Sequence, residues 1–337
     1  MSEKGGVSGL AACVGAVVGA GFVSGREVIA FFTRYGAHAP WLIALSSAAM
    51  ALLCGLCMRR ARRVGTENWW DLYGGMPAWV RVGARLCAAM MLSVAGGAMV
   101  SASGWLTALL WANEWAYPLG AVGTLLSAWL VGRRSLGALG RVSGLLTAVL
   151  IGALIAARMG ESDFPGAVLA PPAGSLAWAA VRAVAYAAMN LTLAIGVVCR
   201  MAGGPKERTP WLCGGLGAVL AALLMLGSGL YARHPELASA DFPIVRLLAR
   251  YGRAGFVTSA ALLYLAVFTS LAAVTCALDS AVAGRGPYLR AALAMGLPLA
   301  VSLVGFEGIV DGLYAPAGLA CLMLVLAPLA LRRQTAP

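Results

Sequence analysis

Apolar residues dominate this chain in long stretches that short polar connections separate. A membrane-spanning helix needs about 20 mostly apolar residues, and ten stretches have that character. We therefore predict an all-α membrane protein with ten transmembrane helices, centred in residues 6–34, 40–58, 82–111, 115–132, 142–158, 174–202, 211–231, 254–283, 288–306 and 312–331. Little chain is left over, so residues 1–337 are expected to form a single transmembrane domain.

The composition agrees with a membrane location, because 61% of the residues are hydrophobic and only 11% are charged. The net charge of +12 would suggest nucleic-acid binding in a soluble protein. Here most Lys and Arg residues fall in connections on one side, so the positive-inside rule predicts a cell-membrane protein with cytoplasmic termini and lipid, not nucleic acid, around it. Tryptophans at predicted helix ends fit the interfacial aromatic belt: Trp41, Trp79, Trp111, Trp115 and Trp211.

A glycine-rich break that ends in charge interrupts the first apolar stretch, where residues 18–27 read VGAGFVSGRE. Unpaired backbone groups are costly in hydrocarbon, so non-helical backbone persists only where protein or a polar cavity encloses it. The pattern predicts a discontinuous first helix beside a binding site. The alternative is that Gly15, Gly19, Gly21 and Gly25 form a small-residue surface for helix packing.

Five predicted helices followed by five more suggest two inverted repeats, over residues 5–158 and 174–332. Because five is odd, the second half would cross the membrane in the opposite sense. The sixth helix should then also be discontinuous. We expect its break within Ala183–Thr192, which brings a phenol, an amide and a hydroxyl to the middle of the bilayer.

The segment Gly19–Glu27, followed by Phe31–Phe32 and Tyr35–Gly36, resembles the GAGFASGQE signature of YkvI-like bacterial membrane proteins. Arg26 stands where that signature has glutamine. The resemblance extends over nearly the whole chain and implies a branch of the amino acid, polyamine and organocation (APC) transporter superfamily. That superfamily has a LeuT-type fold of five plus five inverted helices, with discontinuous helices one and six. The implied function is secondary transport of an amino acid or related small organic solute by alternating access, with cation coupling such as symport.

The resemblance also implies substrate contacts along the first and sixth helices. An unwound helix exposes N–H groups that favour an anion and carbonyl groups that favour a cation. For Asn190 the alternative is a simple hydrogen bond between helices. The implied contacts are Gly19, Ala20, Gly21, Phe22, Ser24, Tyr186, Met189 and Asn190.

A sodium ion is the expected coupling ion, and we expect no other cofactor. Sodium-coupled members of the superfamily use a hydroxyl pair on helix eight, which Thr269–Ser270 resembles. With backbone carbonyls of Gly19, Phe22 and Ala266, these hydroxyls would form an oxygen cage for a hard cation. Hydroxyls in membrane helices often bond to their own backbone instead, and a proton or no coupling ion stays open.

Three charged residues inside predicted spans are expected to be functional, because intramembrane charges are expensive. Counting along straight helices places Glu27 and Arg182 at a similar depth, so we predict that they pair across the outer vestibule as a gate. Arg26 would instead meet Glu307 or Asp311 at the outer ends of the last two helices. A static ion pair is the alternative to gating.

Two other classes of function are alternatives to transport. An enzyme is not expected, because the two histidines, His38 and His234, lie in connections and no acid pair or metal-ligand cluster is evident. A membrane sensor that keeps the transporter fold without moving solute is the stronger alternative.

The connection 241–253 is expected to form an amphipathic outer helix, either a lid or a solvated loop helix.

Overall fold

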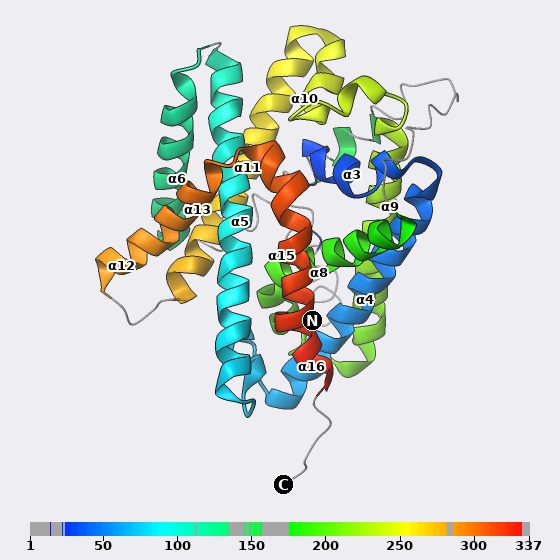
Figure 1. Ribbon diagram of the computed structural model, residues 1–337, viewed down its shortest axis with the longest axis vertical. Coiled ribbons are helices and arrows are strands. Elements are labelled where there is room, and N and C mark those ends of the chain that lie inside the picture. The colour runs from blue at the N-terminus through cyan, green and yellow to red at the C-terminus, as the bar shows by residue number, and fades with distance from the viewer. Residues whose placement is uncertain are drawn as a thin grey trace.

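The computed structural model describes residues 14, 22, 24–111, 113–134, 145, 148–149, 151–153, 155–156, 175–281 and 286–331. Within these residues the protein is helical and contains no strand (Figure 1). The all-α prediction is therefore confirmed. Most of the first and fifth predicted spans lies outside the described residues.

Six helical stretches in the described chain are long and apolar enough to cross a membrane. They are Thr33–Val64, Ala78–Trp111, Leu176–Met201, Lys206–Tyr231, Pro243–Ala281 and Phe306–Ala330. Helices also cover the predicted spans 115–132 and 288–306, as α6 (Ala116–Arg134) and as α12 (Pro287–Ala291), η6 (Ala292–Gly296) and α13 (Leu297–Ser302). The membrane class is supported, whereas the full set of ten spans stays a prediction.

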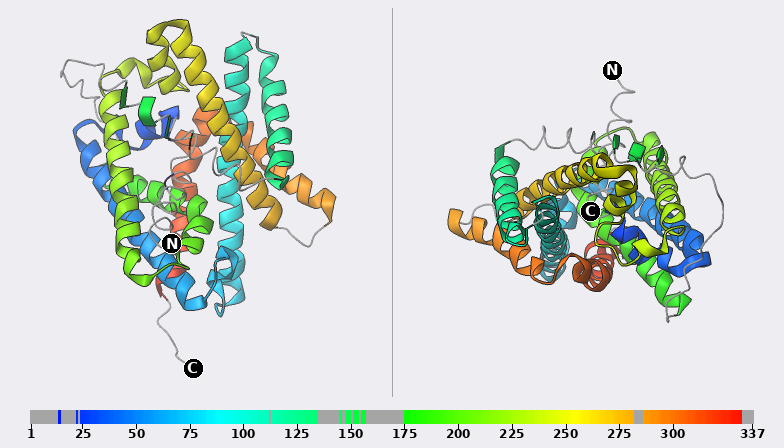
Figure 2. Two further views of the ribbon diagram at one scale, coloured as in Figure 1. Left: turned by 180° about the vertical axis from the view of Figure 1, so that it is seen from behind. Right: turned by 90° about the horizontal axis from the view of Figure 1, so that it is seen from above.

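The helices form two groups (Figures 1 and 2). In the α4 group, α4 (Ala39–Val64) packs against both α8 (Leu176–Met201) and α9 (Thr209–Tyr231). In the α5 group, α5 (Ala78–Trp111) packs against α6, α11 (Gly252–Ala281) and α13. The helix α15 (Tyr314–Ala320) contacts α8 and α5, so it lies between the two groups.

Glycines allow close helix crossings within and between these groups. A Cβ on Gly318 of α15 would lie 2.4 Å from the Ala185 carbonyl oxygen of α8. A Cβ on Gly132 of α6 would lie 2.6 Å from the Ala272 carbonyl oxygen of α11. Small residues at crossings are typical of membrane helices, because lipid offers no hydrophobic force to drive association and close packing must supply it.

The helical backbone is interrupted at Gly25, inside the segment 18–27 for which a break was predicted; residues 18–21 and 23 of that segment lie outside the described residues. Gly25 has φ 85°, and its N–H donates to the Phe22 carbonyl over 3.1 Å, which closes the preceding turn. The chain then starts a separate six-residue helix, α3 (Arg26–Phe31), followed by η1 (Thr33–His38). Figure 1 shows α3 below α10 (Pro243–Leu248), and α3 packs against α8 and α9.

The predicted discontinuity of the sixth helix is wrong, because α8 stays helical through Ala183–Thr192. This stretch contains mainly good helix formers and neither Gly nor Pro. Its polar groups bond to the same helix: the Asn190 amide donates to the Tyr186 carbonyl over 3.0 Å, and the Thr192 hydroxyl donates to the Ala188 carbonyl over 2.8 Å. These bonds satisfy the side chains without opening the backbone.

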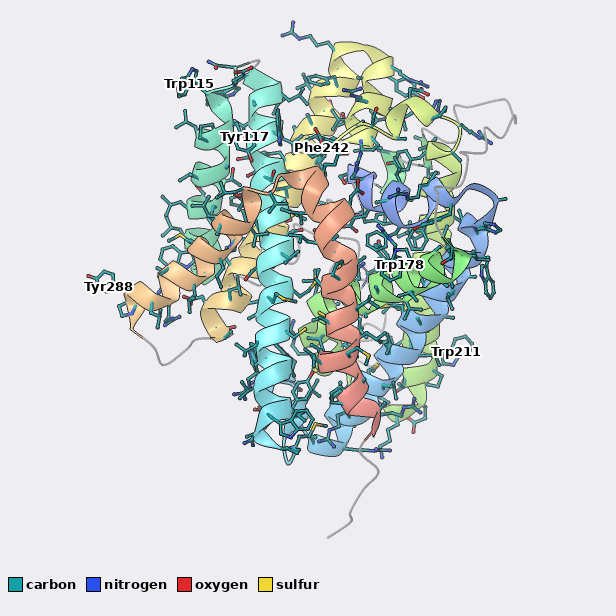
Figure 3. All side chains as sticks on the ribbon, viewed as in Figure 1. Trp115, Tyr117, Trp178, Trp211, Phe242 and Tyr288 are labelled. Atoms are coloured by element: carbon teal, nitrogen blue, oxygen red, sulfur yellow. The ribbon has the colours of Figure 1, made fainter. Side chains whose placement is uncertain are left out.

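Two surface features follow the sequence pattern. The connection 241–253 forms α10 and η5 (Ala249–Tyr251), with Ile244 and Leu247 buried and Arg246 exposed, although Tyr251 is exposed as well. The tryptophans predicted for the interfacial belt are exposed at helix ends; Figure 3 shows Trp115 and Trp211 projecting outward. The exposed residues of the belt are Trp41, Trp79, Trp111, Trp115 and Trp211.

Replacing Gly25 by alanine tests the break in the first helix. A left-handed backbone costs a non-glycine residue about 1–2 kcal/mol, and the new Cβ would also lie 2.4 Å from the Tyr231 hydroxyl. We expect Gly25→Ala to lower the melting temperature in detergent by several degrees. Gly229→Ala on α9 is the control, because nothing lies within 4 Å of its added Cβ. Equal melting temperatures for the two variants would contradict the described backbone.

Candidate functional site

Arg26, the residue that follows Gly25, is buried and lies at the centre of an ion-pair cluster. Its Nη2 atom lies 2.5 Å from Glu307 Oε1 and 2.7 Å from Asp311 Oδ2. Its Nη1 atom donates to the Ala238 carbonyl over 3.0 Å and to the Ala240 carbonyl over 3.3 Å. The predicted contact of Arg26 with Glu307 or Asp311 is confirmed, and both acids take part.

The cluster joins three segments that are distant in sequence. Glu307 lies on α14 (Phe306–Gly308), Asp311 on the π-helical η7 (Ile309–Leu313), and the two carbonyl groups on the connection that leads to α10. The Arg26 side chain is only 5% exposed, whereas those of Glu307 and Asp311 are 58% and 34% exposed. The buried guanidinium therefore depends on these partners more than they depend on it.

Acidic and aromatic residues extend the cluster. Asp241 interacts electrostatically with Glu307, Arg26 and Arg246, and burial, reinforced by the nearby Glu307 carboxylate, raises the pKa of the Asp241 carboxyl. The rings of Phe242 and Phe306 pack 5.2 Å apart between their centroids. Arg26 thus lies among three carboxyl groups, and the Phe242–Phe306 contact joins the residues that adjoin two of them, Asp241 and Glu307.

Glu27 follows Arg26 on α3 and is 5% exposed. It interacts electrostatically with the hydroxyl groups of Tyr186 on α8 and Tyr314 on α15. The Tyr186 hydroxyl lies beside the Glu27 carboxyl but forms no well-aligned hydrogen bond in the described chain. A carboxyl group therefore sits where the first helix, the α4 group and α15 meet.

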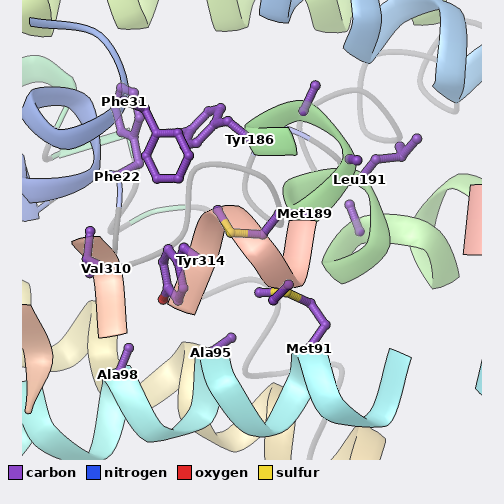
Figure 4. Packing of buried hydrophobic residues seen from close by; sticks show 14 of the residues in the cluster. Phe22, Phe31, Met91, Ala95, Ala98, Tyr186, Met189, Leu191, Val310 and Tyr314 are labelled. Carbon is purple, nitrogen blue, oxygen red and sulfur yellow. The ribbon is translucent and has the colours of Figure 1, made fainter. Parts of the chain in front are cut away.

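Aromatic rings pack around Tyr186, the phenol beside this carboxyl group. The Tyr186 ring lies 5.1 Å from the ring centroids of both Phe31 and Phe32. Figure 4 shows Phe31 beside Tyr186, with Met189 of α8 and Tyr314 of α15 in the same region. Three of the predicted substrate contacts, Phe22, Tyr186 and Met189, are buried in one hydrophobic core cluster.

The predicted pair between Glu27 and Arg182 is wrong. The Arg182 guanidinium lies over the Phe31 ring, 5.1 Å from its centroid, and donates to the Ala30 carbonyl over 3.5 Å. The prediction measured depth along one straight helix, but Gly25 redirects the chain before Glu27. As a result, the Phe31 ring, and not the Glu27 carboxyl, contacts the Arg182 guanidinium.

The other predicted substrate contacts differ in their surroundings. The Ser24 hydroxyl accepts a hydrogen bond from the Arg26 backbone N–H over 3.2 Å, so it caps the start of α3. The Asn190 amide bonds within its own helix, not between helices. Gly19, Ala20 and Gly21 lie outside the described residues.

The proposed sodium ligands stay a prediction. The Thr269 hydroxyl donates to the Ala266 carbonyl of its own helix over 3.1 Å, and Ser270 is half-buried. Phe22 is buried, and Gly19 lies outside the described residues. The Thr269 bond is the backbone contact that membrane hydroxyls commonly make, but it leaves the oxygen lone pairs available.

Buried polar atoms without hydrogen-bond partners are concentrated at this site. Of eight such side-chain atoms in the described chain, five belong to α3 or to residues that contact it. Buried polar groups are nearly always satisfied in native proteins, so these atoms are positions where a water, an ion or a polar ligand would find partners. The five residues are Arg26, Arg182, Tyr186, Tyr231 and Asp311.

Sequence reasoning missed two tyrosines of the site. Tyr231 packs on Gly25 from α9, and Tyr314 lies near Glu27 from α15. The sequence offered one signal for each of them, a single phenol in an otherwise apolar span. Nothing in the local pattern shows which helix such a phenol faces.

A double-mutant cycle tests the Arg26 cluster. Arg26→Gln should destabilise the protein by about 1–3 kcal/mol, because it leaves the carbonyl groups of Ala238 and Ala240 and the partly buried Asp311 carboxylate without their donor. Glu307→Gln should cost about 1 kcal/mol or less, since Glu307 is largely solvated. Adding Asp311→Asn to Arg26→Gln should recover part of the loss. Unfolding in detergent measures these differences.

The control for this cycle is Arg250→Gln, because Arg250 pairs with Glu236 and both side chains are about half exposed. If Arg26→Gln were no more harmful than Arg250→Gln, the buried cluster would not hold α3 in place.

The chain matches no family model and no curated protein.

Proposed function

We propose that the protein is a secondary active transporter of the cell membrane that moves a small organic solute by alternating access, coupled to a cation. The observation that carries this proposal is the break at Gly25, which leaves α3 and its two charged residues enclosed by protein. A broken membrane helix needs such enclosure. A solute would bind between α3, α8 and α15, where the unsatisfied polar groups and aromatic rings meet.

Helix contacts support the predicted inverted repeat. If the two halves are equivalent, α4 corresponds to α9, α5 to α11, and α6 to the segment from α12 to α13. Equivalent elements pack on each other in each case: α4 on α9, α5 on α11, and α6 on η6. That is the pattern expected around a pseudo-two-fold axis.

Contacts between unlike helices also occur in matching pairs. The contact of α6 with α11 has its counterpart in the contact of α13 with α5, and the contact of α4 with α8 has its counterpart in that of α9 with α3. These pairings favour a LeuT-type 5+5 arrangement. They also match the presence of two helix groups, each packed within itself, which is the arrangement that rocking of one group against the other requires.

The Arg26 cluster supports a gate. It connects α3 to η7 and to the connection before α10 through side-chain ion pairs and hydrogen bonds, which exchange readily with water. Breaking these bonds would free α3 from the last helix without disrupting the apolar core. With cytoplasmic termini, as the positive-inside pattern predicts, this gate would face outward.

Solute counterflow in proteoliposomes tests the function. Amino acids and organic amines that raise the melting temperature would be loaded inside vesicles, and uptake of the radiolabelled solute would be followed with and without sodium. We expect saturable uptake that requires internal solute, because alternating access exchanges bound solute across the membrane. Tyr186→Ala should abolish the uptake, whereas Glu236→Gln, on the exposed surface, should leave it intact.

If counterflow were saturable but independent of sodium, the coupling ion would be a cation other than sodium. Thermal stabilisation by a solute without any counterflow would contradict transport and favour a sensor.

A further inference from the structure

Glu27 differs from the other buried carboxyl group of the described chain. Asp279 forms an ion pair with Arg290, whereas no cation among the described residues lies within ion-pair distance of Glu27. Both neighbouring arginines are engaged elsewhere: Arg26 with Glu307 and Asp311, and Arg182 with the Phe31 ring and the Ala30 carbonyl. An unpaired carboxylate is very costly in a low-dielectric interior, so such a group takes up a proton or a cationic ligand.

The surroundings of Glu27 suit an ammonium group. Phe31 lies one helical turn beyond Glu27 on α3, so both side chains share a face of this helix. The Phe31, Phe32 and Tyr186 rings lie in contact there, and aromatic faces attract organic cations. The phenols of Tyr186 and Tyr314 can donate to an ionised carboxyl group or accept from a protonated one.

The groups that bear on the charge of Glu27 come from every element packed on α3. On α3 itself, Glu307 and Asp311 neutralise the charge of Arg26. Together with Asp241, three carboxyl groups lie around one guanidinium, and this excess of acidic groups would attract cations. The titratable and charged residues are Arg182 and Tyr186 on α8, Tyr231 on α9, Arg34, Tyr35 and His38 on η1, Asp311 on η7, Glu307 on α14 and Tyr314 on α15.

We propose, on the basis of the transport function above, that Glu27 binds the ammonium group of an organic amine and carries a proton when no amine is bound. In the exchange, a protonated amine meets the protonated carboxyl group, an ammonium–carboxylate pair forms, and one proton leaves to water. No other species is consumed. The two cations compete for one site, so the transporter exchanges amine for proton.

Proton release on binding tests this proposal. Choline, benzylamine and putrescine would be added to the purified protein in weakly buffered detergent with a pH indicator, and benzyl alcohol would serve as a neutral analogue. At least one amine should bind and release about one proton per molecule bound. Its affinity should rise about tenfold per pH unit while the carboxyl group is protonated. Benzyl alcohol should release none.

Glu27→Gln should weaken amine binding at least tenfold and remove its pH dependence, whereas Glu236→Gln should leave both unchanged. Glu27→Asp, which keeps a carboxyl group, should retain proton release; it also reports on the site if the Gln variant fails to fold. Failure of all three amines to bind, or binding without proton release, would overturn the proposal.

The two proposals fail in different ways. Proton-releasing amine binding without counterflow would refute transport and leave the ammonium site in place. Counterflow of a neutral or acidic solute that Glu27→Gln does not alter would refute the ammonium site and leave transport in place.

Discussion

Backbone that leaves the helix inside a membrane must be enclosed by protein, and this constraint organises the structure around Gly25. The left-handed turn at Gly25 ends one helical segment and starts α3, which places Arg26 and Glu27 in the interior. Arg26 then needs acceptors, and Glu307, Asp311 and the carbonyl groups of Ala238 and Ala240 supply them. The connection before α10 and the start of the last helix are therefore held against the break.

The same constraint links the fold to function. The α4 group and the α5 group each have extensive internal packing. The helix α15 lies where the groups meet, and α3 packs on α8 and α9 of the α4 group and on η7. Ion pairs join the start of α3 to α14 and η7, and the Phe31, Phe32 and Tyr186 rings pack on one another at its other end. The transport that we propose would use both features: helix groups that move as bodies, and polar contacts that close the proposed site.

Local sequence signals predicted part of this arrangement. Apolar stretches gave the helices, the glycines predicted the break, and the cost of a charge in the membrane predicted the acidic partners of Arg26. The break expected in the sixth helix was wrong because Ala183–Thr192 favours a helix and its polar side chains bond within it. Repeat symmetry predicts equivalent positions, but it does not require equivalent backbone.

Contacts that depend on the path of the chain after Gly25 were not predictable. Depth along a straight helix suggested a pair between Glu27 and Arg182, but the turn puts Phe31 over Arg182 and leaves Glu27 beside two phenols. Tyr231 and Tyr314 were missed for the same reason. Tyr231 packs on Gly25 and Tyr314 lies near Glu27, and the direction of the chain at these two residues depends on the left-handed turn at Gly25.

An electron density map of the protein with a bound amine is the most direct test of a solute site at the break. We expect density for the amine between α3, α8 and α15, in contact with Glu27 and Tyr186, and a turn at Gly25 that separates α3 from the preceding helix. A continuous first helix through Gly25, with the amine bound elsewhere, would contradict this view of the molecule.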